Sequence, residues 1–285
     1  MRFAPHRTVQ SLHFQEQFAP VLIGLEAYLI PKTSHNQSYM TISALILAAG
    51  RGQRMRPLTD TTPKPLLNVR GQALIDWHVR ALAEGGFTRL VINTDWLGEQ
   101  FEPHFKHQID LQPNQYGRKQ LLISYSHEGA DFGGALETAG GVARALPQLG
   151  DVFWVLAGDV FTPDFAFTQA AGQRFTASDK LAHLWLVANP AHNLMGDFGL
   201  SANGLALNLP LGSHQIRYTF STIALYRKAF FNSLPFGNPQ GIKAPLAPML
   251  RSAMDNKMVS AELYTGAWTD VGTPERLTEL NRDPY

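Results

Sequence analysis

The chain of 285 residues contains no cysteine, and its charges nearly balance, with a formal net charge of +1. The absence of cysteine excludes disulfide bonds, thiolate metal sites and cysteine nucleophiles, and it is compatible with a reducing compartment. The balanced charge argues against nucleic acid or an anionic membrane as a partner, because binding to either normally needs a clustered basic excess. The apolar patch from Val21 to Ile30 is interrupted by Glu26 and is too short to cross a bilayer. We therefore expect a cytoplasmic protein with no nucleic-acid and no membrane partner.

The composition predicts two regions of unequal character. Residues 1–39 combine the short apolar patch with a polar segment from Pro31 to Tyr39, and Met40 lies four residues before the first apolar core segment. We expect residues 1–39 to be an N-terminal extension that is poorly ordered or not natural, with a degenerate secretion or transit sequence as the alternative. The chain as a whole is 45% hydrophobic, which is enough for a sizeable core. Residues 40–285 are expected to form a single domain.

The stretch from Ala44 to Pro65 predicts a buried strand that leads into an anion-binding loop. The strand is the short apolar run from Ala44 to Leu47. Gly50 and Gly52 permit backbone conformations in which successive N–H groups converge on phosphate oxygens. Lys64 stands between two prolines, whose fixed φ angles stiffen the chain around it. Three arginines add positive charge to the same loop: Arg51, Arg54 and Arg56.

Two better-known phosphate motifs are excluded at this loop. The dinucleotide fingerprint needs a third glycine at the sixth position, but that position counted from Gly50 is Met55, and Pro57 follows. The P-loop needs a Gly-Lys-Ser/Thr run, and the chain contains none. Neither a Rossmann dehydrogenase nor a P-loop kinase is supported.

Apolar runs and helical periodicity alternate along the chain and predict an α/β fold. Strands are expected at Arg89 to Asn93, Leu121 to Tyr125 and Val152 to Ala157, and the helical spacing from Gly71 to Gly86 predicts a helix before the first of them. Strand, helix and strand in this order form a right-handed unit of a parallel sheet with helices on both faces. We predict a Rossmann-like three-layer α/β/α domain. Residues 106–120 are expected to form a surface excursion. A further strand is expected at Leu181 to Asn189, after which the sheet should continue as mixed or antiparallel, with half-exposed strands at Asp197 to Leu200 and Gln215 to Leu225. A helix is expected at Ala244 to Met254.

Two further segments are candidates for substrate binding. The apolar run Val152 to Ala157 ends in Gly158 and Asp159, and open α/β sheets bind ligands at the carboxyl ends of their strands. A carboxylate there suits Mg²⁺, which combines few protein oxygens with substrate phosphates, although a turn or cap role for Asp159 is the alternative. The glycine-rich turn from Ala135 to Gly141 opens a predicted helix, and free N–H groups at a helix start form a second anion or base-recognition surface.

Three motifs together resemble those of the sugar-1-phosphate nucleotidylyltransferases, which join a nucleoside triphosphate to a sugar 1-phosphate. The segment Leu47-Ala-Ala-Gly-Arg-Gly-Gln-Arg-Met-Arg-Pro-Leu-Thr59, followed by Thr62-Pro-Lys-Pro-Leu66, is similar to the family's first signature. The segment Leu136-Glu-Thr-Ala-Gly-Gly141 resembles the loop that lines the base, and Trp268-Thr-Asp-Val-Gly-Thr-Pro274 resembles the last signature. The resemblance covers about Met40 to Arg282 and implies a mixed, mostly parallel sheet, the nucleotide-diphospho-sugar transferase fold.

The resemblance implies Mg²⁺ as cofactor and a site for two substrates. It implies Asp159 and Asp270 as metal ligands, and Arg54, Lys64 and Asp159 as catalytic residues. The expected sugar-binding residues are His192, Asp197 and Ser221. The expected nucleotide-binding residues are Ala48, Ala49, Gly50, Arg51, Gly52, Gln53, Arg54, Lys64, Asn93, Glu128, Thr138 and Gly140.

Two positions depart from the family pattern. Ala157 stands where many relatives have asparagine, so a direct side-chain contact is not expected there. Thr222 stands in the run Phe220-Ser-Thr-Ile223, where the resembled run has glycine, and it is expected to narrow the sugar side of the site.

The resemblance is greatest to family members that transfer uridylyl from UTP to N-acetylmuramate 1-phosphate in peptidoglycan recycling, and it implies a UDP-sugar and pyrophosphate as products. Guanylyl transfer to mannose 1-phosphate and thymidylyl transfer to glucose 1-phosphate are the alternatives, because those members share the first and last motifs. A non-catalytic nucleotide-sensing subunit is the alternative of another class. Such a subunit would lack a metal-binding carboxylate or the arginine of the phosphate loop. This chain has both expected carboxylates, the loop arginine and the loop lysine: Asp159, Asp270, Arg54 and Lys64.

Overall fold

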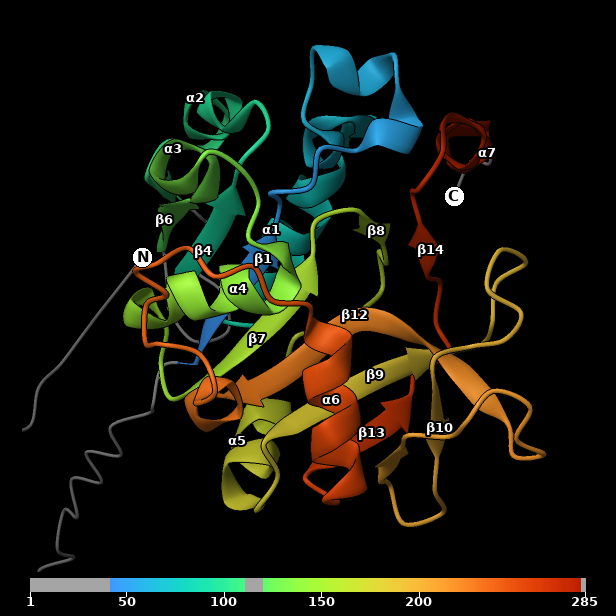
Figure 1. Ribbon diagram of the computed structural model, residues 1–285. Coiled ribbons are helices and arrows are strands. Elements are labelled where there is room, and N and C mark those ends of the chain that lie inside the picture. Colours follow the sequence, from blue (N-terminus) through green and yellow to red (C-terminus); the bar gives the residue numbers. More distant parts are fainter. Residues whose placement is uncertain (1–41, 111–119, 283–285) are drawn as a thin grey trace, which may run out of the picture. The chain divides into compact units, whose positions relative to one another are not determined.

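The computed structural model describes residues 42–110 and 120–282. The expected N-terminal extension, residues 1–39, lies outside the described residues, and so does most of the surface excursion expected at 106–120. The chain divides after Tyr39, and Met40–Tyr285 forms the second of its two units. The fold and the site described below belong to the second unit (Figure 1).

A mixed sheet forms the centre of the second unit. Ten strands of the described residues take part, in the order β11-β10-β12-β7-β1-β4-β6-β5, with β9 and β13 extending from β12. The parallel part contains the strands that the sequence predicts, and in the register Leu45 lies between Val91 and Val155. These strands are β1 (Ser43–Leu47), β4 (Arg89–Thr94), β6 (Gln120–His127) and β7 (Val152–Ala157).

The topology becomes mixed after β7, as the sequence predicts, because antiparallel pairs are joined there by a parallel pair, residues 259–263 with residues 182–186. The long strand β12 (Arg217–Arg227) pairs antiparallel with β7 and with β9 (Ala182–Val187). Its second half is not half-exposed, because neighbouring strands cover both of its edges and the residues from Ile223 to Tyr226 are fully buried. The other strands of this sheet are β5 (Gln108–Asp110), β10 (Phe198–Leu200), β11 (Ala206–Leu207) and β13 (Val259–Leu263).

Helices cover both faces of the sheet and give the predicted three layers. One core packs against α1 (Leu74–Glu84) and α5 (Gln169–Ala177), and the other packs against α4 (Glu137–Ala145) and α6 (Leu246–Asp255) (Figure 1). Alternate strand residues point to opposite faces, which is why Ala44 belongs to the first core and Leu45 to the second. No helix in the described ranges is long and apolar enough to span a bilayer.

Helix α1 shows how the sequence pattern becomes packing. Leu74, Ile75, Val79 and Leu82 recur at helical spacing, and all four are buried. Burial of each such side chain is worth about 1.5–3 kcal/mol. The helix begins at Leu74, three residues later than the pattern predicts, because residues 72–73 pair with residues 68–69 as a hairpin.

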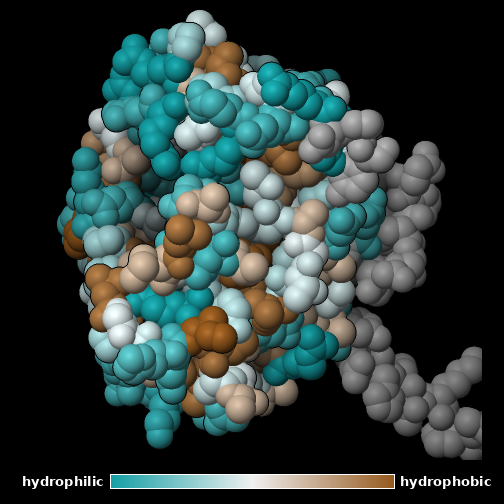
Figure 2. Space-filling model, turned by 90° about the vertical axis from the view of Figure 1, so that its right-hand side faces the viewer, coloured by the Kyte–Doolittle hydropathy of each residue, from teal (hydrophilic) through white to brown (hydrophobic). Residues whose placement is uncertain are grey.

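Shorter elements complete the second unit. On the face in Figure 2, apolar residues occur as separate groups among hydrophilic ones. The short elements are β2 (Asn68–Val69), β3 (Gln72–Ala73), β8 (Val160–Phe161), β14 (Thr269–Asp270), α2 (Phe101–Phe105), α3 (Glu128–Phe132) and α7 (Pro274–Arg282).

Candidate active site

The loop after β1 is held rigidly at the carboxyl end of the sheet. Gly52 has a φ of +63°, and a Cβ atom there would lie 3.0 Å from Cγ2 of Thr59 and 3.3 Å from Cβ of Lys64. Only glycine therefore meets both the backbone and the space requirements. The Thr59 hydroxyl donates to the Gly52 carbonyl at 2.8 Å, and the Met55 side chain is fully buried. These contacts fix the loop while its backbone faces a pocket.

This first pocket has a volume of about 410 Å³ and lies at the carboxyl ends of β1, β4 and β7. It is where the sequence places the phosphates and the nucleotide. The predicted residues that line it are Ala48, Ala49, Gly50, Gly52, Arg54, Lys64, Asn93, Glu128, Thr138 and Asp159.

Three residues predicted to bind the nucleotide do not line this pocket. The guanidinium of Arg51 lies over the Trp96 ring, 4.3 Å from its centroid. Gln53 is exposed in a short 3-10 helix. Gly140 lies inside α4, where a Cβ would come within 2.5 Å of the carbonyl oxygen of Ile242. These positions shape the loop and the helix instead of facing the cavity.

A buried hydrogen-bond network connects the phosphate loop to the start of α4. The backbone N–H of Ala48 donates to Oδ1 of Asn93 at 2.6 Å, and Nδ2 of Asn93 donates to Oε1 of Glu128. The N–H of Leu136 donates to Oε2 of Glu128 at 2.7 Å. Burial raises the pKa of Glu128 above its ordinary value. A Cβ at Gly141 would lie 2.3 Å from Oε1 of Glu128, so that glycine makes room for the network.

Asp159 lies at the edge of the first pocket in an ion pair with Lys64. Its Oδ2 atom is 2.6 Å from the Lys64 Nζ atom, and the lysine side chain is only 8% exposed. Beneath this pair, Nε2 of His78 donates to the carbonyl oxygen of Val160 at 2.8 Å. Burial lowers the pKa of His78 to about 4, so the imidazole is neutral and holds the turn that carries Asp159.

Asp270 comes close to Asp159 through the pairing of β8 with β14. The N–H of Val271 donates to the backbone carbonyl of Asp159 at 3.0 Å. Oδ2 of Asp270 lies 2.7 Å from Nη1 of Arg276 and 3.3 Å from Nε2 of His192. His192, predicted on the sugar side, therefore lies against Asp270 and lines neither of the two pockets at this site.

The two carboxylates are chemically compatible with Mg²⁺. Among the described residues, no group of three or more His, Cys, Asp or Glu side chains is arranged to hold a metal ion. Mg²⁺ typically takes one or two carboxylates and completes its octahedron with water and substrate phosphates. Asp159 and Asp270 lie on adjacent backbone segments, and the ion pairs engage the Oδ2 atom of each. This donor set fits an ion shared with a phosphate.

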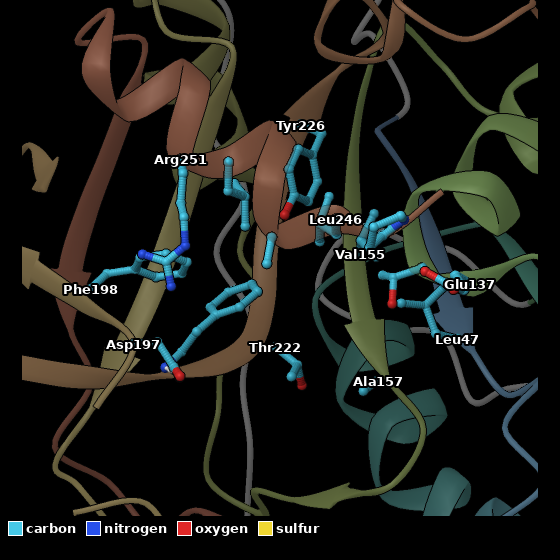
Figure 3. A pocket seen from close by; sticks show the side chains of 15 residues that line it. Leu47, Glu137, Val155, Ala157, Asp197, Phe198, Thr222, Tyr226, Leu246 and Arg251 are labelled. Atoms are coloured by element: carbon cyan, nitrogen blue, oxygen red, sulfur yellow. Dashed lines mark hydrogen bonds between the residues drawn. The ribbon is translucent and has the colours of Figure 1, made fainter. Parts of the chain in front are cut away.

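A second pocket, of about 550 Å³, adjoins the first. Its walls come from β7, β10, β12 and α6, and Figure 3 shows the Tyr226 ring beside Leu246 and Phe198 beside the Arg251 side chain. Asp197 also lines it, and Oδ2 of Asp197 accepts a hydrogen bond from the N–H of Phe220 at 2.8 Å. Four residues line both pockets: Leu47, Glu137, Thr138 and Ala157.

Comparison with known proteins identifies the family. The model of the nucleotidyl transferase family matches residues 43–201. The chain is 46% identical over 240 residues to the N-acetylmuramate alpha-1-phosphate uridylyltransferase of Neisseria meningitidis, which covers 84% of this chain and 96% of that relative. The chain belongs to the sugar-1-phosphate nucleotidylyltransferase family. An enzyme of the same name from Caulobacter vibrioides is 34% identical over 177 residues, covering 57% of this chain and 66% of that relative.

The solved structures confirm the predicted fold of this nucleotidylyltransferase. UDP-glucose pyrophosphorylase from Acinetobacter baumannii matches with a TM-score of 0.63 at 19% identity, over 85% of this chain and 92% of that one. At this identity the likeness concerns the fold alone. It is the nucleotide-diphospho-sugar transferase fold that the sequence predicts.

One strand at the second pocket of this nucleotidylyltransferase differs from the sequence prediction. Ser221 is fully buried, donates to the Trp185 carbonyl at 2.7 Å and does not line the second pocket. The register of β12 shifts between Phe220 and Ala224, which interrupts the alternation of side chains. Thr222 lines the pocket instead, with a φ of +68°, a conformation that is rare for a β-branched residue.

Other pocket residues were missed by the sequence reasoning. Glu137 has a φ of +58° and lines both pockets, and it stands between two residues of the recognised Leu-Glu-Thr motif. Arg251 lies on α6, a segment that the sequence predicts only as a helix from Ala244 to Met254. The motif offered a signal for Glu137, whereas nothing in the pattern around Arg251 indicates a pocket.

Proposed function

We propose that this chain is a Mg²⁺-dependent uridylyltransferase that converts UTP and N-acetylmuramate 1-phosphate into UDP-N-acetylmuramate and pyrophosphate. The observation that carries the proposal is the pair of adjoining pockets, of about 410 and 550 Å³, with four lining residues in common. Two connected cavities suit a reaction in which two substrates meet at one phosphate. The name of the Neisseria meningitidis relative supports this choice of nucleotide and sugar. The proposal includes a cytoplasmic location and a role in peptidoglycan recycling.

The first pocket is proposed to hold UTP and the second the acceptor sugar. The backbone N–H groups from Gly50 to Gly52 and the guanidinium of Arg54 would neutralise the β- and γ-phosphates. Lys64 would contact the reacting phosphate near the junction of the pockets. Asn93 and Glu128 would position the nucleotide site indirectly, because their described hydrogen bonds hold the backbone of Ala48 and Leu136 in place.

The proposed chemistry needs positioning more than covalent help. An oxygen of the sugar 1-phosphate attacks the α-phosphorus of UTP, a new P–O bond forms, and the bond to the leaving pyrophosphate breaks. The sugar phosphate is already ionised near neutral pH, so no strong general base is required. The chain's task is to hold the two phosphates in line and to exclude competing water.

Asp159 and Asp270 are the residues proposed to hold the metal. When bound, Mg²⁺ supplies positive charge that neutralises the phosphate oxygens as charge builds on the leaving group. Lys64 and Arg276 pair with these carboxylates at 2.6 and 2.7 Å. These contacts orient both acidic side chains.

Pyrophosphate release tests the proposal. The protein is incubated with Mg²⁺ and with each pairing of UTP, GTP and dTTP with the 1-phosphates of N-acetylmuramate, mannose and glucose. Selective release with UTP and N-acetylmuramate 1-phosphate is the expected result. Release with another pair would overturn the substrate assignment, and a folded sample that releases none with any pair would refute the enzymatic proposal.

A further inference from the structure

The acceptor pocket has one cationic side chain, Arg251, among its described lining residues. Most of the other lining residues are aliphatic or aromatic, and the polar ones are two carboxylates and three hydroxyl groups: Glu137, Asp197, Thr138, Thr222 and Tyr226. These carboxylates and hydroxyls can hydrogen-bond to sugar hydroxyls, but none of them carries positive charge. An arginine among apolar side chains is instead suited to one anionic group that the ligand itself brings.

Arg251 is placed by α6 and by two neighbours. Its Nη1 atom donates to Oδ1 of Asn208 at 2.9 Å, and its Cζ atom lies 5.2 Å from the centroid of the Phe198 ring. No carboxylate of the described residues lies within ion-pair distance of Arg251, in contrast to Arg144 and Arg276, which pair with aspartates at 2.7 Å. Its guanidinium is thus oriented by a neutral amide and a ring, while its charge is left for a ligand.

The position of Arg251 relative to the first pocket indicates which part of the acceptor would carry the anionic group. In Figure 3, Arg251 and Phe198 lie on one side of the acceptor pocket, and Leu47, Glu137 and Ala157 lie on the other. The latter three also line the phosphate pocket. An acceptor whose 1-phosphate points to the shared side therefore directs its far side toward Arg251.

We propose that Arg251 selects acidic acceptor sugars by binding their carboxylate, an inference that rests on the function proposed above. N-acetylmuramate carries a lactyl ether with one carboxylate and one methyl group, and N-acetylglucosamine is the same sugar without this ether. The guanidinium presents a planar fork to the carboxylate, and the Phe198 and Leu250 side chains offer apolar surface to the methyl group. A neutral sugar leaves the half-buried charge of Arg251 without a partner, which disfavours it.

The test measures kcat/KM with UTP for three acceptors: N-acetylmuramate 1-phosphate, its lactyl methyl ester and N-acetylglucosamine 1-phosphate. The variants are Arg251→Met, which removes the charge at similar length, and Arg251→Lys, which keeps the charge without the fork. Arg89→Met is the matched control, because Arg89 is an exposed arginine at the amino-terminal end of β4, away from both pockets. Circular dichroism and thermal unfolding verify that each variant is folded.

We expect Arg251→Met to lower kcat/KM for N-acetylmuramate 1-phosphate by about 10- to 100-fold, mostly through KM, as for loss of a charge-assisted hydrogen bond. The loss with N-acetylglucosamine 1-phosphate should be at least about tenfold smaller, because no carboxylate contact is removed. Arg251→Lys should fall between wild type and Arg251→Met. The methyl ester should be a poor substrate for the wild type and should lose little further in Arg251→Met. Arg89→Met should behave as the wild type does.

Three outcomes would overturn the inference. One is an equal kcat/KM of the wild type for N-acetylmuramate 1-phosphate and its lactyl methyl ester. This comparison needs no variant, so it tests the inference even if Arg251→Met fails to fold. Another is an equal loss for acidic and neutral acceptors in Arg251→Met, which would indicate a merely structural role. The third is turnover of N-acetylglucosamine 1-phosphate in preference to N-acetylmuramate 1-phosphate. Absence of pyrophosphate release by the wild type with every acceptor would instead refute the proposed function.

Discussion

His78 should make the stability of this protein depend on pH in a way that one substitution removes. The imidazole is completely buried under the turn that carries Asp159, and it donates to the Val160 carbonyl at 2.8 Å. Burial lowers its pKa from 6.5 to about 4. The unfolded chain therefore binds the proton more readily than the folded protein, and stability falls as the pH drops from about 6.5 toward about 4.

The size of this effect follows from the two pKa values. With 6.5 in the unfolded chain and about 4 in the folded protein, moving from about pH 7.5 to about pH 5 costs about 2 kcal/mol of unfolding free energy. The substitution His78→Leu removes the titrating group and also one hydrogen bond, which is worth about 1 kcal/mol. The variant should thus be about 1 kcal/mol less stable than the wild type at about pH 7.5 and about 1 kcal/mol more stable at about pH 5.

Urea denaturation followed by tryptophan fluorescence measures this crossover, since the chain has five tryptophans. The quantity that decides is the difference in unfolding free energy between wild type and His78→Leu at each pH, because it cancels the titration of all other groups. His214→Gln is the control, since it replaces an exposed histidine. If the difference between wild type and His78→Leu is the same at both pH values, His78 is not held neutral by the fold and the reasoning is wrong.

Three further predictions concern the site. Asp159→Asn should lower turnover by more than about 100-fold, as for loss of a charged group at the reacting phosphates. The same substitution should lower the free energy of unfolding by less than about 1 kcal/mol, because the ion pair of Asp159 with Lys64 is partly exposed. Pyrophosphate release measures the turnover and thermal unfolding measures the stability. Retained turnover would contradict the assignment of Asp159 as a metal ligand. Gly141→Ala should destabilise the protein by about 1–3 kcal/mol, because the new Cβ would meet Oε1 of Glu128 at 2.3 Å, whereas the control Gly134→Ala has nothing within 4 Å and should be nearly neutral. Tyr226→Phe should keep or raise stability by about 1 kcal/mol, because the buried hydroxyl has no hydrogen-bond partner among the described residues; a clear loss in urea denaturation would show that it has one.

Much of the parallel half of the fold could be predicted from the sequence. The apolar runs that became β1, β4, β6 and β7 are short and bounded by polar or glycine-rich turns, and the helical spacing of α1 is regular. Each of these signals depends on the residue's own backbone and on its burial, so it can be read locally. The phosphate loop was predictable for the same reason, because glycine permits the positive φ that Gly52 adopts in the loop.

The lining of the second pocket depended on packing between distant segments. Ser221 lies in the core and not at the pocket because the register of β12 shifts between Phe220 and Ala224 in its pairing with β9, a change that no alternation pattern along β12 itself reveals. His192 meets Asp270 because the segment after β9 packs against β14, which lies more than seventy residues further along the chain. Contacts of this kind are set by the tertiary arrangement.

What the sequence determined by itself was the family, the parallel core and the phosphate loop, since these follow from local backbone requirements and from long ordered motifs. What only the tertiary structure decided was which side chains of the second half of the chain line the second pocket. Arg251 is the clearest case. Its position on α6 looks like any exposed turn of an amphipathic helix, and it faces a cavity only because α6 packs across β12 beside β10.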